Sequence, residues 1–310
     1  MGAKRSWLGI IVVTVAIVAV GWTDGDPIAD YKVHTGTSSS QDWVSISVDF
    51  HSCGLHSDGT VECWGCDRKT MTGVDVDCGQ CDANVGEFKS VALGMIYTCG
   101  LKKDGTLECW GDEKMGLFGS PPKGTFVAID GGPTMMCGIE TDASLACWFC
   151  ARSDKSRCVP PEGRFVDVAV GSDGSCALDE EGNVHCWSCK DDSEESSLCS
   201  PPAKKFKDID CGILQCCGVR EDAGIECWGH HAGVIGNEFE AVSVGVFSCG
   251  IRTNGSIRCW MFPMDDVWVP NGDYQRVTAL SVGYGYACAI SEPGTVHCWG
   301  DSEIGRSTPP

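Results

Sequence analysis

The chain has 310 residues, a net charge of −20 and 23 cysteines, a cysteine content far above ordinary usage. An acidic surface of this size repels phosphate backbones, so the composition argues against nucleic-acid binding. The cysteines indicate an oxidising compartment, where disulfides persist, and argue against a cytosolic protein.

Residues 1–23 predict a secretory signal peptide. "MGAKR" is a short basic start, "LGIIVVTVAIVAV" is an apolar run, and Ala19-Val20-Gly21 offers small residues for cleavage. A retained signal-anchor is the alternative, because residues 6–23 carry no charge and nearly span a bilayer. Either outcome places the rest of the chain outside the cytoplasm, secreted or at the cell surface.

Residues 24–41 are polar and rich in turn formers, which predicts a tether or a loosely added edge strand. From residue 42 to residue 310 the sequence consists of seven repeats of about forty residues. The copies share one motif, "CGLHSDGTVECWG" in the first, and begin at residues 53, 99, 137, 176, 217, 249 and 288. A repeat of this size buries its apolar face only against its neighbours.

Each repeat opens with an aromatic residue or Val and continues in short β-like runs separated by Gly and Pro. The openers are Trp43, Phe88, Phe126, Phe165, Phe206, Phe239 and Val277. Seven units of about forty residues, each with room for four short strands, predict an all-β fold, a seven-bladed β-propeller.

The two cysteines of each motif lie ten positions apart around a turn. If Cys53 faces Cys63 in an antiparallel hairpin, a three-residue loop ends at Gly59. Directly facing residues lie close enough for a disulfide. One cross-strand disulfide is therefore predicted in every repeat: Cys53–Cys63, Cys99–Cys109, Cys137–Cys147, Cys176–Cys186, Cys217–Cys227, Cys249–Cys259 and Cys288–Cys298.

Gly occupies the last position of that loop in five of the seven repeats. Ala143 and Ala223 stand there in the third and fifth repeats. Because the position requires a left-handed backbone that Gly tolerates best, we expect a shifted turn in these two repeats, with Gly224 as the candidate replacement in the fifth.

Nine further cysteines form a second set. Three of them follow the second motif Cys by three residues and three precede the next opener by seven, which predicts tail disulfides. These are Cys66–Cys81, Cys150–Cys158 and Cys189–Cys199. Of the remaining three, Cys211 and Cys216 are expected to pair, which leaves Cys78 as a free or intermolecular thiol in an otherwise monomeric protein.

Cys63-x₂-Cys66 and Cys78-x₂-Cys81 also have the outline of a four-cysteine zinc site. However, Cys63 is one of seven equivalent motif positions, and its counterparts lack a second Cys-x₂-Cys. Disulfides are therefore the favoured interpretation, and we predict no metal and no cofactor.

The pattern G-x₄-C-G-L-x₃-D-G-x-V-x-C-W-G-D resembles the repeats of the regulator of chromosome condensation superfamily across residues 42–310. The resemblance implies a seven-bladed propeller. Two cysteines per repeat are most similar to the ectodomains of crinkly-type receptor kinases, although these 310 residues hold no kinase domain. Secretion also suits the secreted propeller-type β-lactamase inhibitor. The signal, the acidity and the cysteines depart from the nuclear exchange factor for the small GTPase Ran.

Catalysis is not predicted. His185 and His297 lie at a strand position that other repeats fill with Glu, Ala or Arg, and both are expected to face solvent. His230 and His231 begin a tail loop without spaced carboxylates. The sequence holds no Gly-rich phosphate loop, HExxH motif or nucleophile elbow.

The short loops before the first motif Cys vary in content while their flanks do not, and in this class of propeller they converge on one face. Their aromatic, thioether and polar side chains predict a surface for a protein, a peptide or a sugar. The alternative is that these side chains pack between neighbouring blades. The candidates are Phe50, His51, Tyr97, Met135, Met136, Asp173, Gln215, Phe247, Tyr284 and Tyr286.

Three features lie outside these loops. "KDDSEESS" (190–197) predicts a solvated acidic loop rather than a calcium site, because its carboxylates lack the ligand spacing. Phe262 and Trp268 form either an exposed anchor or a cover over a blade edge. Asn254-Gly255-Ser256 is a glycosylation sequon on a hairpin turn.

Together these patterns predict an extracellular, disulfide-stabilised propeller that binds a protein or peptide without catalytic activity. A secreted enzyme inhibitor and a carbohydrate-binding lectin are the alternatives, and an exchange factor for a small GTPase is a remote one. Nucleic acid is not an expected partner, and a membrane is expected only through residues 6–23.

Overall fold

The computed structural model describes residues 34–38, 40–66, 79–83, 86–111, 120–150, 158–189, 198–230, 232–261, 265–267, 269, 275–300 and 308–310. They belong to one compact unit, Lys32–Pro310, and the other unit, Met1–Tyr31, lies outside the described residues. Cys78, His231, the 190–197 loop, Phe262 and Trp268 also lie outside them. Among the described residues, no helix is long and apolar enough to cross a bilayer.

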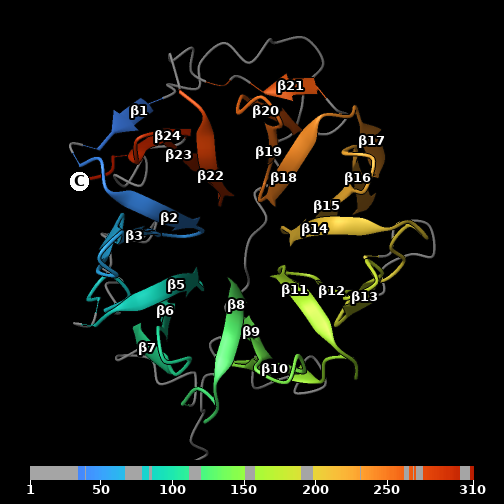
Figure 1. Cartoon of the computed structure of the whole chain (residues 1–310), viewed down its shortest axis with the longest axis horizontal. Coiled ribbons are helices and arrows are strands. Elements are labelled where there is room, and N and C mark those ends of the chain that lie inside the picture. The colour runs from blue at the N-terminus through green and yellow to red at the C-terminus, as the bar shows by residue number, and fades with distance from the viewer. Residues whose placement is uncertain are drawn as a thin grey trace, which may run out of the picture. The chain divides into compact units, whose positions relative to one another are not determined.

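Seven antiparallel sheets surround a common axis as the blades of a propeller, which confirms the predicted fold (Figure 1). The inner strands, nearest the axis, are β2 (Trp43–Val48), β5 (Phe88–Leu93), β8 (Phe126–Gly132), β11 (Phe165–Val170), β14 (Phe206–Cys211), β18 (Phe239–Val244) and β22 (Val277–Val282). They begin blades 1 to 7 in chain order.

Each inner strand pairs with a middle strand, and each middle strand pairs with a third. The middle strands are β3 (Ser52–His56), β6 (Tyr97–Lys102), β9 (Met135–Glu140), β12 (Ser175–Asp179), β15 (Gln215–Arg220), β19 (Ser248–Arg252) and β23 (Tyr286–Ser291). The third strands are β4 (Val61–Trp64), β7 (Leu107–Gly111), β10 (Leu145–Trp148), β13 (Val184–Trp187), β16 (Ile225–Gly229), β20 (Ile257–Met261) and β24 (Thr295–Gly300). Outer strands are described for blades 5, 6 and 7: β17 (Gly233–Ile235), β21 (Asp265–Val267) and β1 (His34–Thr37).

The ring closes through its first strand. β1 pairs antiparallel with β24, from His34 opposite Gly300 to Thr37 opposite His297. The connection continues at Ser38, whose N–H donates to the Val296 carbonyl (3.0 Å) and whose Oγ accepts the Val296 N–H (3.1 Å). The segment that precedes the repeat region therefore supplies the outer edge of the last blade.

This closure changes the environment of one of the two motif histidines. His185 on β13 is exposed beside Asp179, with 2.9 Å between Nε2 and the carboxylate. His297 on β24 is half-buried, and its Nε2 lies 2.9 Å from the Ser291 hydroxyl. The expectation that His297 faces solvent is therefore wrong, because β1 adds a strand on that side. Burial lowers the pKa of His297.

The ten cysteine pairs expected from spacing form disulfides, and so does Cys211–Cys216, the pair expected among the three remaining cysteines. The motif cysteines face each other in register, as Cys53 faces Cys63, with 4.0 Å between their Cα atoms. This short separation is characteristic of a facing pair that makes no backbone hydrogen bonds with each other. Cys211 and Cys216 also face each other, across β14 and β15, so this bond joins an inner strand to its middle strand.

The hairpin turns contradict one expectation. Ala143 and Ala223 adopt the left-handed conformation themselves, with φ of 72° and 63°. Each donates its N–H to the carbonyl three residues earlier over 2.9 Å, as Gly59 does in blade 1. The turns are therefore not shifted, and Gly224 does not replace Ala223. Register between facing cysteines fixes the loop, so the backbone accepts the strain of a left-handed Ala.

The core is divided among the seven junctions between consecutive blades. Each hydrophobic cluster combines residues of two neighbours, and one of them joins blade 7 to blade 1 through Tyr286 and Trp43. The openers are buried, and the glycine after the first motif Cys leaves room for them. At Gly138, for example, a Cβ would lie 2.8 Å from the Phe126 ring. Glycine makes this room in five of the seven blades, whereas Ala177 and Ala289 occupy the position in blades 4 and 7.

Candidate functional site

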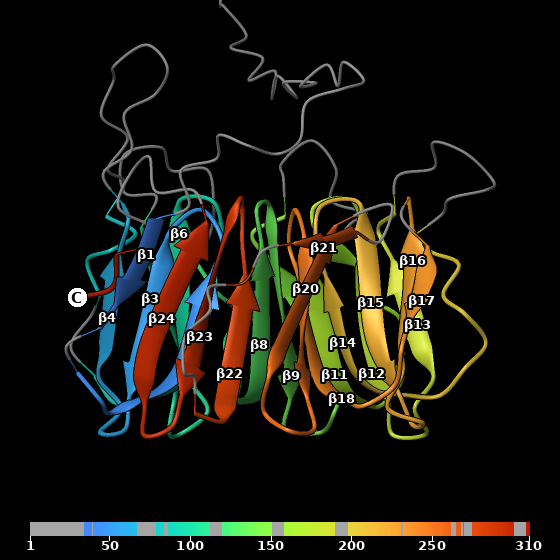
Figure 2. The same cartoon turned by 90° about the horizontal axis from the view of Figure 1, so that it is seen from above.

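The two ends of the ring differ in what they present. Because strands alternate in direction within a blade, the loops between inner and middle strands lie at one end and the hairpin turns lie at the other (Figure 2). We call these ends the loop face and the turn face. The loops of the loop face are residues 49–51, 94–96, 133–134, 171–174, 212–214, 245–247 and 283–285.

Neighbouring loops on the loop face are joined through their backbones. The Ser172 N–H donates to the Gly212 carbonyl (3.1 Å), and the Tyr284 N–H donates to the Asp49 carbonyl (3.3 Å). Close approach explains why glycine directly follows five of the seven inner strands: at Gly212 a Cβ would lie 2.5 Å from the next blade's carbonyl oxygen. The loop tips are therefore held in fixed positions by the blades on either side.

An apolar surface follows four consecutive blades on this face. Leu214, Val246 and Tyr284, at the loop tips of blades 5, 6 and 7, expose 37%, 42% and 46% of their surface. The half-buried ring of Phe50 in blade 1 stacks on Tyr284, with 5.1 Å between centroids and 17° between planes. We call these four residues the apolar arc. Exposed aromatic and aliphatic side chains on a fixed backbone suit recognition of an apolar partner surface.

The structure separates the ten sequence candidates into two groups. Phe50, Asp173 and Tyr284 lie at loop tips and are at least partly exposed. The other seven are buried, which matches the alternative of packing between blades: His51, Tyr97, Met135, Met136, Gln215, Phe247 and Tyr286.

Four of the buried candidates form polar contacts from one blade to the next. The Tyr97 hydroxyl donates to the carbonyl of Gly132 (3.0 Å), and Gln215 Nε2 donates to the hydroxyl of Ser248 (2.7 Å). The other two contacts link His51 Nε2 to Thr98 Oγ1 (2.7 Å) and the Tyr286 hydroxyl to Ser52 Oγ (2.9 Å). These side chains hold the ring together beneath the loop face.

Sequence reasoning missed Leu214 and Val246. The signal that could have found them is their distance from the first motif Cys: Leu214 and Val246 lie three residues before it, and Tyr284 lies four before. Side chains two residues before that Cys, such as Tyr286, lie at the start of the middle strand or directly before it, and the candidates among them are buried. The sequence candidates therefore combined loop-tip positions with strand positions.

Four aspartates near the axis form a second unusual group, which we call the aspartate belt. It consists of Asp130 on β8, Asp167 on β11 and Asp208 and Asp210 on β14. Each accepts a backbone N–H from the next blade: Asp130 from Val170 (2.6 Å), Asp167 from Ile209 (3.4 Å), Asp208 from Val242 (2.9 Å) and Asp210 from Val244 (2.7 Å). The belt thus links blades 3, 4, 5 and 6.

Burial raises the pKa values of all four carboxyls of the aspartate belt, and neighbouring carboxylates add to this effect for three of them. Desolvation, followed by neighbouring carboxylates, raises the pKa of Asp208 to about 8, although Lys207 acts in the opposite direction. Desolvation also raises the pKa of Asp210 to about 7 and of Asp167 to about 6. The pKa of Asp130 is raised well above its ordinary value by burial and by Asp210. These raised pKa values favour fewer than four negative charges on the belt at neutral pH.

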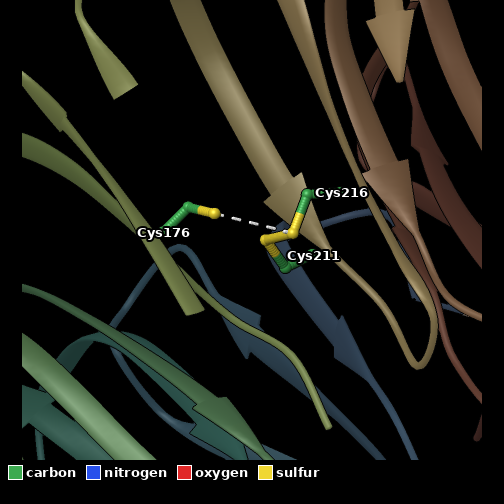
Figure 3. Close-up of side chains that lie close together, drawn as sticks. All are labelled: Cys176, Cys211 and Cys216. Atoms are coloured by element: carbon green, nitrogen blue, oxygen red, sulfur yellow. Dashed lines mark hydrogen bonds between the residues drawn. A yellow bond between two sulfur atoms is a disulfide. The ribbon is translucent and has the colours of Figure 1, made fainter. Parts of the chain in front are cut away.

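Among the described residues, one group of His, Cys, Asp or Glu comes close enough together to hold a metal ion: Cys176, Cys211 and Cys216 (Figure 3). The Sγ atoms of Cys176 and Cys216 lie 3.7 Å apart between blades 4 and 5. All three are already in disulfides, Cys176 with Cys186 and Cys211 with Cys216. A metal ion binds cysteine as a thiolate, and a cysteine in a disulfide offers none. The group is therefore a contact between two disulfides and not a metal site.

Comparison with known proteins identifies the repeat and the fold. Residues 165–192, which begin with the inner strand of blade 4, match the family model of the regulator of chromosome condensation (RCC1) repeat. The resemblance seen in the sequence is therefore confirmed. No curated protein sequence matches the chain.

Three solved structures illustrate the likeness. The CRINKLY WD40 ectodomain of the Arabidopsis thaliana receptor kinase ACR4 superposes with a TM-score of 0.66 and 22% identity, covering 86% of this chain and 97% of that one. The entire ectodomain of the Physcomitrella patens receptor kinase CR4 gives 0.62 and 19%, covering 81% and 71%. Prp20p of Saccharomyces cerevisiae gives 0.58 and 14%, covering 85% and 83%. These likenesses show a shared propeller fold.

Proposed function

We propose that this chain is an extracellular, non-catalytic binding module that recognises a protein or peptide through the loop face. The observation that carries the proposal is the apolar arc. Its tips expose large apolar side chains on backbones fixed by neighbouring blades, so little ordering entropy would be lost on binding. The eleven disulfides and the likeness to receptor-kinase ectodomains support an extracellular location.

Partner chemistry follows from the arc. Tyr284 stacked on Phe50 offers a flat aromatic surface, and Leu214 and Val246 extend it with aliphatic groups over two further blades. A complementary partner presents apolar side chains to this surface. The Prp20p propeller also binds proteins, and its partners are Gsp1p and histones.

The test compares two triple variants of the full, oxidised chain. Leu214→Ser, Val246→Ser and Tyr284→Ser together remove the exposed part of the arc. The matched control is Val44→Ser, Val127→Ser and Val166→Ser, three exposed valines on inner strands away from the loop tips. Proteins captured from extracellular fluid are identified by quantitative mass spectrometry for each variant and for the unaltered chain.

We expect one or a few partners that the unaltered chain and the control retain and the arc variant loses. Equal capture by the arc variant and the unaltered chain would reject the arc as the binding surface. Capture of a hydrolase together with loss of its activity would favour the inhibitor alternative. Retention of one sugar class on a glycan array, abolished in the arc variant, would favour a lectin.

A further inference from the structure

The hairpin turn of blade 6 holds an exposed asparagine in a fixed geometry. Asn254 Oδ1 accepts the backbone N–H of Ser256 (2.9 Å) and the Ser256 hydroxyl (2.7 Å). Gly255 between them takes the left-handed conformation, with φ of 81°. Both donors bind the amide oxygen, and within the described part of the chain the amide nitrogen has no protein partner. Asn254 is exposed, and the hydrogen bonds of the turn leave its Nδ2 unused.

Three other blades build the same turn with aspartate. In each, one carboxylate oxygen accepts the N–H and the hydroxyl of the residue two positions later, as in blade 6. The aspartate Oδ1 lies 2.8–3.0 Å from the backbone nitrogen and 2.6–2.7 Å from the hydroxyl oxygen of that residue. The three pairs are Asp58 with Thr60, Asp104 with Thr106, and Asp142 with Ser144. The turn thus requires an acceptor oxygen and a hydroxyl. It does not require an amide nitrogen, which is present in blade 6 and absent from the aspartate turns of blades 1, 2 and 3.

We propose that Asn254 is a modification site, the acceptor of an N-linked glycan. Its amide nitrogen, exposed and adjacent to a hydroxyl already bound to the amide oxygen, has the arrangement that the Asn-x-Ser/Thr acceptor provides. The inference rests on the proposed extracellular location, because the sugar donor is met in the secretory pathway.

The reaction is a glycosyl transfer from an oligosaccharide activated as a lipid-linked pyrophosphate. A bond forms between Asn254 Nδ2 and C1 of the first sugar, and the bond between C1 and the pyrophosphate oxygen breaks. The lipid pyrophosphate leaves with the electron pair, and the amide gives up one proton to a base of the transferase. No oxidant or reductant is needed.

The position of the glycan agrees with the proposed binding surface. Asn254 lies on the turn face, at the opposite end of the strands from the loops that carry Val246 and Tyr284. A bulky, hydrated glycan there covers turns and leaves the apolar arc accessible. A glycan at residue 254 is therefore compatible with partner binding at the loop face.

The experiment uses the full chain produced in a eukaryotic secretory culture and recovered from the medium. N-glycosidase treatment in heavy-oxygen water converts a glycosylated Asn into a labelled Asp, which peptide mass spectrometry locates. Asn254→Asp is the matched control, because Asp58, Asp104 and Asp142 show that aspartate closes this turn. Asp104→Asn tests the geometry in the reverse direction, since it adds an amide to the equivalent turn of blade 2.

We expect the heavy-oxygen label at residue 254 of the unaltered chain. We also expect the apparent mass of that chain on a gel to fall by the mass of one glycan after N-glycosidase treatment. Asn254→Asp should lose the glycan and keep its thermal midpoint, and Asp104→Asn should gain a second glycan. Secreted chain without label at residue 254 would overturn the inference and leave the extracellular location intact. Chain retained in the cytosol without a glycan would overturn both.

Discussion

Asp210 on β14 accepts the backbone N–H of Val244 on β18, with 2.7 Å between oxygen and nitrogen, so one carboxylate joins blade 5 to blade 6. Asp208 does the same two residues earlier, to Val242. A protonated carboxyl still accepts this hydrogen bond through its carbonyl oxygen. The aspartate belt can therefore hold adjacent blades together while carrying protons.

The first prediction concerns pH. The pKa values of Asp167, Asp208 and Asp210 are raised by folding, so the folded chain binds more protons than the unfolded chain between about pH 4 and about pH 8. Their ionisation therefore opposes folding as pH rises. We expect the free energy of unfolding, measured in guanidinium chloride, to fall between about pH 5 and about pH 8.5. The Asp208→Asn variant should have a higher free energy of unfolding than the unaltered chain at about pH 8.5 and the same free energy at about pH 5.

A control for this prediction is Glu162→Gln, which neutralises an exposed carboxylate outside the belt. It should leave the pH dependence unchanged. If stability stays flat or rises with pH, and Asp208→Asn follows the same curve as the unaltered chain, the belt does not hold protons at neutral pH.

The second prediction is an order of disulfide reduction. The second motif Cys is half-buried in blades 1 to 4, at Cys63, Cys109, Cys147 and Cys186. In blades 5 to 7, for which an outer strand is described, the second motif Cys is buried. Cys227 exposes 2% of its surface, and Cys259 and Cys298 expose 1% each. Thiol attack requires access, so limited reduction under native conditions should open the bonds of blades 1 to 4 first. Alkylation followed by peptide mass spectrometry measures the order, and equal rates in all blades would contradict it.

The third prediction tests ring closure. A truncated chain that begins at residue 39 lacks residues 34–38, and so it loses the pairing of β1 with β24 and both hydrogen bonds of Ser38. We expect a lower thermal midpoint and reduction of Cys288–Cys298 at a rate like that of Cys176–Cys186. A chain that begins at residue 34 is the control. Unchanged protection of Cys298 in the shorter chain would show that β1 does not seal blade 7.

The fourth prediction concerns close packing at the loop face. Gly212→Ala places a methyl group 2.5 Å from the Gly245 carbonyl oxygen, which the rigid neighbouring blade cannot avoid. Overpacking of this kind costs about 1–3 kcal/mol of unfolding free energy. Gly124→Ala is the control, because its nearest neighbour is the flexible end of Glu140. Equal stability of the two variants in chemical denaturation would contradict the steric account.

Local spacing determined much of this protein. The ten-residue interval between Cys53 and Cys63 defines a hairpin register, and seven copies of that interval define seven hairpins. A disulfide between facing residues depends only on that register, so the seven motif pairs could be predicted without knowing where blades lie. The same locality explains the glycine that follows the first motif Cys in five repeats, because a Cβ there would meet the opener of the same blade.

Only the tertiary structure decided which loop residues reach the surface and which aspartates keep protons. Tyr284 and Tyr286 are two residues apart in one loop region, yet one is exposed and the other contacts Ser52 in the neighbouring blade. The pKa of Asp208 likewise depends on the burial that packing imposes and on carboxylates of its own and an adjacent inner strand. Sequence determines the contacts that each repeat makes within itself, because those contacts are short in chain distance. Surfaces, shared protons and closure by β1 depend on contacts between blades, which no single repeat contains.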